Sequence, residues 1–205
     1  DCASDVDADG VCDDAEIQGC TDSTAENFNP SATEDNASCT YGPEEEDTST
    51  FLGLTYEEVA VDLVADSRTY RVYAQFDGAN HEVVSVFGNA EDPMLLESVA
   101  GFHQSVTGGP LASAIPGGTL YDDLAADSWL TIGGENATTA TALQSVGIDF
   151  ASFETGGDLE VSSSFGGGLV VVPGEQASAT AGPDGRVLIG QFTSAAQMDW
   201  TLNIQ

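Results

Sequence analysis

The chain has 205 residues, of which 35 are Asp or Glu and only 3 are Lys or Arg, so its formal net charge at pH 7 is −32. Because a nucleic-acid site needs basic side chains that displace phosphate counterions, this composition excludes nucleic acid as a partner. An anionic membrane surface would repel the chain, and no apolar run of about eighteen residues is present to insert into a bilayer. The charge is tolerated where salt and divalent cations screen it, which predicts a saline, marine-like exterior.

The segment Asp5–Glu16 carries acids at alternating positions, with Gly10 in the middle and a glutamate at the end. This is the full pattern of a calcium loop, in which carboxylates turn inward and the glycine permits a sharp bend. The alternative is an acidic, solvated loop. The expected ligands are the side chains of Asp5, Asp7, Asp9, Asp13 and Glu16 and the carbonyl of Val11.

Short flanks distinguish this loop from a helix–loop–helix sensor. Only four residues precede it, and at most one helical turn, Ala15 to Gln18, follows before Gly19. The loop therefore resembles the stand-alone calcium loops of thrombospondin type 3 and dockerin-like repeats. This resemblance implies that calcium holds a small segment together.

All four cysteines lie in the first forty residues, which in an extracellular chain predicts two disulfides. Of the three possible pairings, Cys2–Cys12 with Cys20–Cys39 is favoured, because the second bond closes one compact loop. A zinc site is the weaker alternative, since there is no C-x-x-C spacing and both histidines are distant in the sequence.

Residues 19–41 contain, in order, Gly-Cys-Thr-Asp, Asn-Phe-Asn-Pro, Ala-Thr, Glu-Asp and Ser-Cys. Together with Val-Cys-Asp at 11–13, the segment 1–41 resembles a short module of secreted proteins from marine bacteria, notably Bacteroidetes, and from some marine algae. The resemblance implies a secreted, cell-surface location and a spacer role, but no activity. Glu26 stands where many copies of the module have a cysteine.

The same module offers oxygens for a second, weaker calcium site. The candidate ligands are Asp22, Asn27, Asn29 and Asp35. The alternative is that these residues serve turns, which Asn and Asp do without a metal. Two tripeptides match the N-glycosylation sequon, and they begin at Asn36 and Asn136.

The acidic run 42–50 is expected to form an extended linker, because Pro43 stiffens it and its four consecutive acids repel one another. The predicted organisation is a disulfide-rich calcium-binding module over 1–41, this linker, and a β-sandwich domain over 51–205.

Short alternating stretches separated by turn residues predict strands throughout the last part of the chain. The expected strands cover 58–65, 69–76, 82–87, 94–99, 129–132, 148–153, 159–163, 169–172, 186–192 and 200–204. Asp66-Ser67 is expected to form a turn, Asp77-Gly78 to form a hairpin turn, and 120–126 to contain a short helix. Such a series predicts an all-β sandwich or jelly roll.

Four stretches of this part, at 69–76, 83–88, 127–133 and 184–192, resemble a β-rich module of large secreted marine bacterial proteins. The resemblance implies an architecture and a location, and it implies no reaction.

Catalytic candidates are sparse, and no enzyme is predicted. A loop histidine, His81 or His103, could pair with a serine and an aspartate, but such a histidine is more often a surface residue. There is no Gly-x-Ser-x-Gly, and the glycines at 166–168 lack the Lys-Ser/Thr of a phosphate loop. Four aromatic residues could stack on sugars, although strand placement of both tryptophans favours core packing. They are Phe102, Tyr121, Trp129 and Trp200.

Two functions fit these features. The first is an extracellular structural or adhesive protein, a calcium-stabilised subunit of a surface filament, fibre or matrix. Its partners would be copies of itself or other surface proteins, with residues 1–41 against a neighbouring subunit. The second is a calcium-dependent carbohydrate-binding module of a secreted multidomain protein, whose partners would be glycans.

Overall fold

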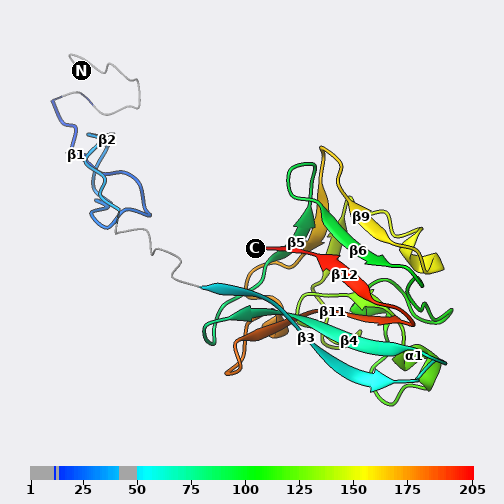
Figure 1. The fold of residues 1–205 in the computed structure, drawn as a ribbon. Coiled ribbons are helices and arrows are strands. Elements are labelled where there is room, and N and C mark those ends of the chain that lie inside the picture. Colours follow the sequence, from blue (N-terminus) through cyan, green and yellow to red (C-terminus); the bar gives the residue numbers. More distant parts are fainter. Residues whose placement is uncertain (1–11, 13, 42–49) are drawn as a thin grey trace. The chain divides into compact units, whose positions relative to one another are not determined.

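A computed structural model describes residues 12, 14–41 and 50–205. The chain divides into two compact units, Asp1–Thr48 and Ser49–Gln205 (Figure 1). The linker expected over 42–50 lies outside the described residues except for its last position. None of the described helices is long and apolar enough to cross a membrane.

The first unit is held by a disulfide and very little regular structure. Strands β1 (Gln18–Gly19) and β2 (Glu34–Asp35) pair in parallel. Among its described residues, only Cys20 and Ala25 are buried apolar side chains. The predicted Cys20–Cys39 disulfide is confirmed, and it closes a loop over residues 20–39. A segment this small buries too little apolar surface to stay folded without such a cross-link.

The described part of the second unit, residues 50–205, contains three antiparallel sheets. The first has the order β3-β4-β11-β7, with β3 (Phe51–Val61), β4 (Arg68–Phe76), β11 (Arg186–Ser194) and β7 (Trp129–Leu130). The second has the order β13-β5-β10-β8, with β13 (Asn203–Ile204), β5 (Ser85–Gly88), β10 (Gly167–Val170) and β8 (Gln144–Val146). The third has the order β12-β6-β9, with β12 (Met198–Thr201), β6 (Met94–Ser98) and β9 (Leu159–Val161).

Helical structure is short. The helix expected within 120–126 is present as α1 (Asp122–Ala125). Three single 3₁₀ turns accompany it: η1 (Ala112–Ala114), η2 (Phe153–Thr155) and η3 (Ala177–Ala179). The all-β class is therefore confirmed.

The core of this unit follows from strand alternation. In β4, Val72, Ala74 and Phe76 are buried, whereas the intervening Tyr73 and Gln75 are only partly buried, because successive side chains point to opposite faces. Buried residues of all three sheets belong to one hydrophobic cluster among the described residues. The sheets are therefore layers around a common core.

The strand expected at 148–153 is wrong. Residues 148–150 have no regular structure, 151–152 form a turn that leads into η2, and the strand of that region is β8 at Gln144–Val146. The Asp149 carboxylate accepts the N–H of Ala151, which stabilises a turn at that point.

The hairpin expected at Asp77-Gly78 is also absent. Strand β4 already has β3 on one edge and β11 on the other, so the strand after the turn, β5, joins a different sheet. By contrast, the turn at Asp66-Ser67 joins the paired strands β3 and β4 as expected.

The strand expected at 200–204 is divided between two sheets. Trp200 pairs with Leu96 of β6, and Asn203 pairs with Phe87 of β5. The buried Leu202 separates β12 from β13. The C-terminal segment thus connects two sheets of the unit.

Candidate functional site

The predicted calcium loop lies mostly outside the described residues. Of its candidate ligands, only Glu16 is described, and it is partly buried. The other candidate ligands, Asp5, Asp7, Asp9, Val11 and Asp13, lie outside the described residues. Calcium binding by this loop stays a prediction.

The predicted Cys2–Cys12 pair also extends beyond the described residues, because Cys2 is not among them. None of the described cysteines is a free thiol.

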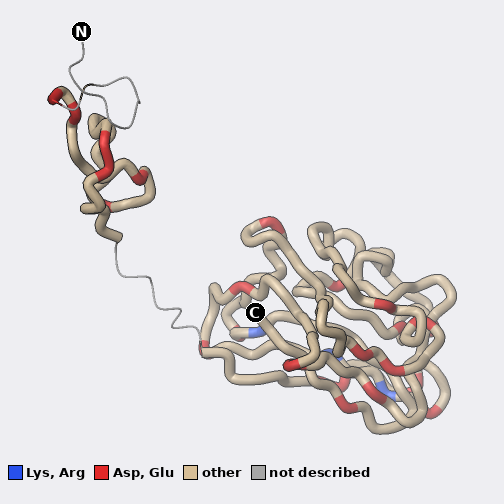
Figure 2. The backbone as a smooth tube through the Cα atoms, turned by 90° about the horizontal axis from the view of Figure 1, so that it is seen from above, with Lys and Arg blue, Asp and Glu red and all other residues tan. Residues whose placement is uncertain are grey.

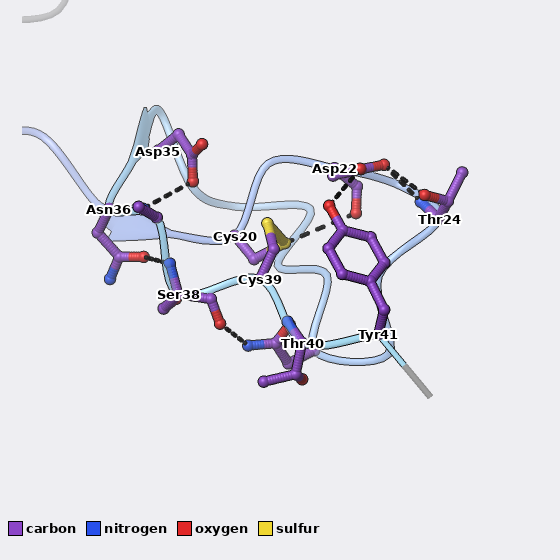
Figure 3. Close-up of a disulfide and its surroundings, with 11 residues drawn as sticks. Cys20, Asp22, Thr24, Asp35, Asn36, Ser38, Cys39, Thr40 and Tyr41 are labelled. Atoms are coloured by element: carbon purple, nitrogen blue, oxygen red, sulfur yellow. Dashed lines mark hydrogen bonds between the residues drawn. A yellow bond between two sulfur atoms is a disulfide. The ribbon is translucent and has the colours of Figure 1, made fainter. Parts of the chain in front are cut away.

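The Asp22 carboxylate organises the surroundings of the Cys20–Cys39 disulfide (Figure 3). One oxygen accepts the backbone N–H and the hydroxyl of Thr24, at 2.9 and 2.7 Å, and the other accepts the hydroxyl of Tyr41 at 2.7 Å. These bonds, the backbone one above all, lower the pKa of Asp22. The carboxylate therefore ties Tyr41, the last described residue of the unit, to the turn after Cys20.

The other three candidate ligands of the second calcium site are also engaged in hydrogen bonds within the unit. Asn29 and Asp35 each accept the backbone N–H two residues later in the chain, which stabilises turns. Asn27 donates to the carbonyl of Ser38 at 2.7 Å and accepts the N–H of Thr40 at 2.8 Å, which links it to a distant segment. In Figure 3, Asp22 and Asp35 lie on opposite sides of the disulfide. A second calcium ion stays a prediction.

Both sequon asparagines lie in turns near the surface. Asn36 is exposed, and its side-chain oxygen accepts the N–H of Ser38. Asn136 is partly buried, and its oxygen accepts both the N–H and the hydroxyl of Thr138. Glycosylation at either position stays a prediction.

Both histidines make local contacts with carboxylates. The Nε2 atom of His103 lies 3.1 Å from Oδ1 of Asp123, and Ser105 donates to Oδ2 of the same carboxylate at 2.6 Å. Serine and imidazole thus share an aspartate, whereas a nucleophilic pair needs the serine to donate to the imidazole. The Nε2 atom of His81 lies 3.0 Å from Oδ1 of Asp77.

A cleft of about 690 Å³ opens in the second unit, where the end of the β3–β4 hairpin faces β12. Its walls combine aromatic rings with charged and polar groups. The lining residues are Tyr56, Asp66, Arg68, Tyr70, Ser194, Ala195, Ala196, Gln197, Met198, Asp199 and Trp200. We call this feature the aromatic cleft.

Three rings form the apolar part of the aromatic cleft. Tyr56 meets Trp200 edge to face, with 5.5 Å between ring centroids, and meets Tyr70 in the same way at 5.8 Å. Behind them, the buried Phe192 stacks on Trp200 at 6.5 Å. Tyr56 is 63% exposed, whereas Tyr70 and Trp200 are partly buried. Packing therefore holds the rings in position while leaving ring surface open to a ligand.

A shared carboxylate fixes the polar wall. Glu58 accepts a hydrogen bond from Arg68 and another from the hydroxyl of Tyr70 at 3.1 Å. The bond from Arg68 is the main cause of a lowered pKa at Glu58, and burial together with Glu58 raises the pKa of Tyr70. Glu58 offsets the charge of Arg68, and Asp66 and Asp199 add two carboxylates to the lining. The cleft therefore carries no excess positive charge.

Serine hydroxyls hold the floor of the aromatic cleft. Ser194 donates to the carbonyl of Gly101 at 2.7 Å, and its oxygen accepts the hydroxyl of Ser98 at 2.8 Å and the N–H of Ala196. The Ser98 oxygen also lies 3.2 Å from the carbonyl oxygen of Gln197. The segment 194–197 is therefore tied to β6 and to the loop after it.

The aromatic residues singled out from the sequence have different positions. Trp129 is buried in the core, as expected from its place in a strand, and Phe102 is buried as well. Trp200 lies in a strand as expected, but one side of it lines the aromatic cleft. Tyr121 is exposed, and its hydroxyl pairs with Thr107.

Sequence reasoning missed the other members of this site. Tyr56 precedes the strand expected at 58–65, and Tyr70 was placed only within the strand expected at 69–76. Their approach to Trp200 depends on the packing of two different sheets, for which the local sequence carries no signal.

The free edge of β3 is the second surface feature of this unit. Among the described strands, β3 pairs only with β4. Bulges interrupt the pairing at Leu52 and at Val59, which are 59% and 41% exposed, and the segment Gly53–Glu58 between them is regular. An edge of this kind can pair with another strand, and the bulges aim two apolar side chains outward.

Comparison of the chain with protein-family models, with curated proteins and with solved structures gives no match.

Proposed function

We propose that this chain is a secreted structural or adhesive protein that serves as a subunit of a surface filament, fibre or matrix. In this proposal, a calcium-stabilised, disulfide-linked module precedes a β-sandwich or jelly-roll domain. The partners are copies of the chain or other surface proteins. The observation that supports the proposal most directly is the free, partly apolar edge of β3.

The edge of β3 offers both backbone pairing and apolar contact. The regular segment Gly53–Glu58 can pair with the same segment of a second copy in antiparallel orientation, which joins two sheets across a two-fold axis. Leu52 and Val59, at its two ends, would then become buried between the copies. Burial of such exposed apolar surface favours association.

A two-fold contact alone closes into a dimer, so growth into a filament needs a second, different contact. We assign that role to the predicted N-terminal module, residues 1–41, against a neighbouring subunit. Since the two copies are both strongly acidic, calcium in the N-terminal loop and salt in the medium would lower their repulsion. Acidic residues occur throughout the described parts of both units, so this repulsion is general (Figure 2).

The experiment is analytical ultracentrifugation of the full chain in about 0.5 M NaCl with calcium at about 2 mM, with electron microscopy of the same samples. The test variant carries Leu52→Asp and Val59→Asp. The control variant carries Val99→Asp and Val106→Asp, which add the same charge at two side chains that are both fully exposed.

We expect the wild-type chain and the control to form multimers as protein concentration rises. The β3 variant should form smaller assemblies, because only the contact through residues 1–41 remains. A calcium chelator should shorten or dissociate the wild-type assemblies. The proposal is wrong if the wild type stays monomeric under these conditions, or if the β3 variant and the control assemble alike.

A second candidate function is carbohydrate binding by a calcium-dependent module. It is favoured by the aromatic cleft, which combines three rings with polar side chains on a fixed floor. Small-ligand sites commonly combine apolar walls with a few fixed polar groups.

A further inference from the structure

We propose that the aromatic cleft is a binding site for an uncharged sugar unit of a polysaccharide, and that it recognises the sugar directly, without a bridging cation. This inference rests on the carbohydrate binding of the second candidate function, replaces its calcium dependence with direct recognition, and is independent of assembly through β3. It assigns the ligand class and the residues that contact it.

The rings supply the surface for the apolar face of the sugar. Tyr56 projects beyond the core on the same face of the sheet as the buried Val72, with which it pairs in register. It lies edge to face with Trp200, so the two rings meet at a corner rather than closing over each other. A pyranose ring has C–H groups on its faces and hydroxyls at its edge, and it fits such a corner with one face on an aromatic ring.

The polar side chains match the edge of the sugar. Asp66, Asp199 and Gln197 are exposed at the wall and offer acceptors and donors for hydroxyl groups. Gln197 donates to the Asp199 carboxylate at 3.2 Å, which orients both side chains. A site that already aligns its polar groups loses less entropy when a ligand binds.

The charge of the aromatic cleft selects the ligand class. Arg68 is engaged by Glu58, so an acidic sugar would face the carboxylates of Asp66 and Asp199 without a free cation to offset them. Like charges at a binding surface disfavour binding. An uncharged sugar avoids this cost and still uses the carboxylates as hydrogen-bond acceptors.

The fluorescence of Trp200 is expected to report whether a ligand occupies the aromatic cleft. The chain has only two tryptophans, and Trp129 is 2% exposed in the core. A ligand in the aromatic cleft would therefore change the fluorescence of Trp200 and leave that of Trp129 unaltered. The titration uses the full chain with Leu52→Asp and Val59→Asp, so that association through β3 does not interfere.

The probes are cellohexaose and laminarihexaose as uncharged sugars, an alginate oligomer as an acidic sugar, and deca-proline as a peptide that suits aromatic grooves. Each is titrated with and without a calcium chelator. The test substitution is Tyr56→Ala, and the matched control is Tyr121→Ala, a tyrosine of the same unit that is 54% exposed and outside the cleft.

We expect at least one uncharged sugar to bind with a dissociation constant on the order of 1 mM, with or without the chelator. Tyr56→Ala should weaken this binding by roughly tenfold, and Tyr121→Ala should leave it unchanged. The inference is overturned if neither uncharged sugar alters the emission of Trp200, if alginate or deca-proline binds more tightly than both, if the chelator abolishes binding, or if the two tyrosine variants behave alike. None of these outcomes depends on whether the chain assembles.

Discussion

Asp127 shows how one buried side chain organises a long loop. It is fully buried, and its carboxylate accepts the N–H of Ser105 at 2.7 Å and that of Gly109 at 3.0 Å. Burial raises its pKa, against the effect of these two bonds. Gly108 approaches so closely that a Cβ atom there would lie 1.8 Å from the carboxylate oxygen. The loop from His103 to Gly109 therefore folds around a single acceptor group.

Asp127→Ala is expected to destabilise the second unit by about 3 kcal/mol, because two buried N–H groups lose their acceptor. Urea unfolding followed by tryptophan fluorescence measures the change. Asp92→Ala, which removes an exposed carboxylate, serves as the control and should change stability by less than about 0.5 kcal/mol. Equal losses in the two variants would contradict the assigned role of Asp127.

Arg186 connects three strands of the first sheet. From the start of β11 it reaches Glu57 of β3 at 3.2 Å and pairs with Asp184 at 3.1 Å. Its guanidinium lies 4.4 Å from the ring centroid of Tyr73 on β4, and the hydroxyl of Tyr73 donates to Glu57 at 2.7 Å. The edge strand β3 is thus held to the interior of the sheet by side chains as well as by its ladder.

Arg186→Gln is expected to lower stability at pH 7 by about 1 kcal/mol, the sum of partly exposed ion pairs and a cation–π contact. The pKa of Glu57 is lowered, first by Tyr73 and then by Arg186, and that of Asp184 is lowered by Arg186. A carboxyl group whose pKa is lowered by folding stabilises the folded state at pH values above its unfolded pKa. This stabilisation is lost as the pH falls through the lower pKa of the folded state.

The difference between Arg186→Gln and the wild type should therefore shrink as pH falls from 7 toward 3. Thermal melts of both proteins across this range measure it. Arg68→Gln, which removes only one exposed pair, should give a smaller loss at pH 7. A difference that stays constant with pH would show that packing, and not charge, explains the role of Arg186.

The charge of the whole molecule should make its stability depend on salt. With 35 acids against 3 basic residues, the compact state carries strong self-repulsion at low ionic strength. The three arginines all lie on β4 and β11, and each is paired with an acid, so they offset only local charge. Salt therefore has to screen the repulsion among the remaining acidic side chains.

The melting temperature of the full chain is expected to rise by several degrees, roughly 5 °C, when NaCl increases from about 10 mM to about 500 mM. Most of the rise should occur below about 0.15 M, where the screening length falls to about 8 Å. Calorimetry at a series of NaCl concentrations measures this. A rise that appears only above about 1 M would instead indicate exclusion of salt from the protein surface.

The sequence by itself determined the features that depend on local pattern. Alternation of residues predicted the strand at 69–76, which is present as β4, because the side-chain period of a strand marks its two faces. The spacing of Cys20 and Cys39 predicted their disulfide, because a small acidic segment needs a cross-link. The all-β class followed from repeated short strands and turns in the same way.

Only the tertiary structure decided which strands pair and which surfaces remain open. The Asp77-Gly78 turn was expected to make a hairpin, but both edges of β4 were occupied by strands distant in the sequence. Tyr56 and Trp200 likewise meet because two sheets pack together at the end of the β3–β4 hairpin. Strand pairing and cleft formation depend on long-range packing, which a local pattern does not encode, and so the candidate site became visible only in the folded chain.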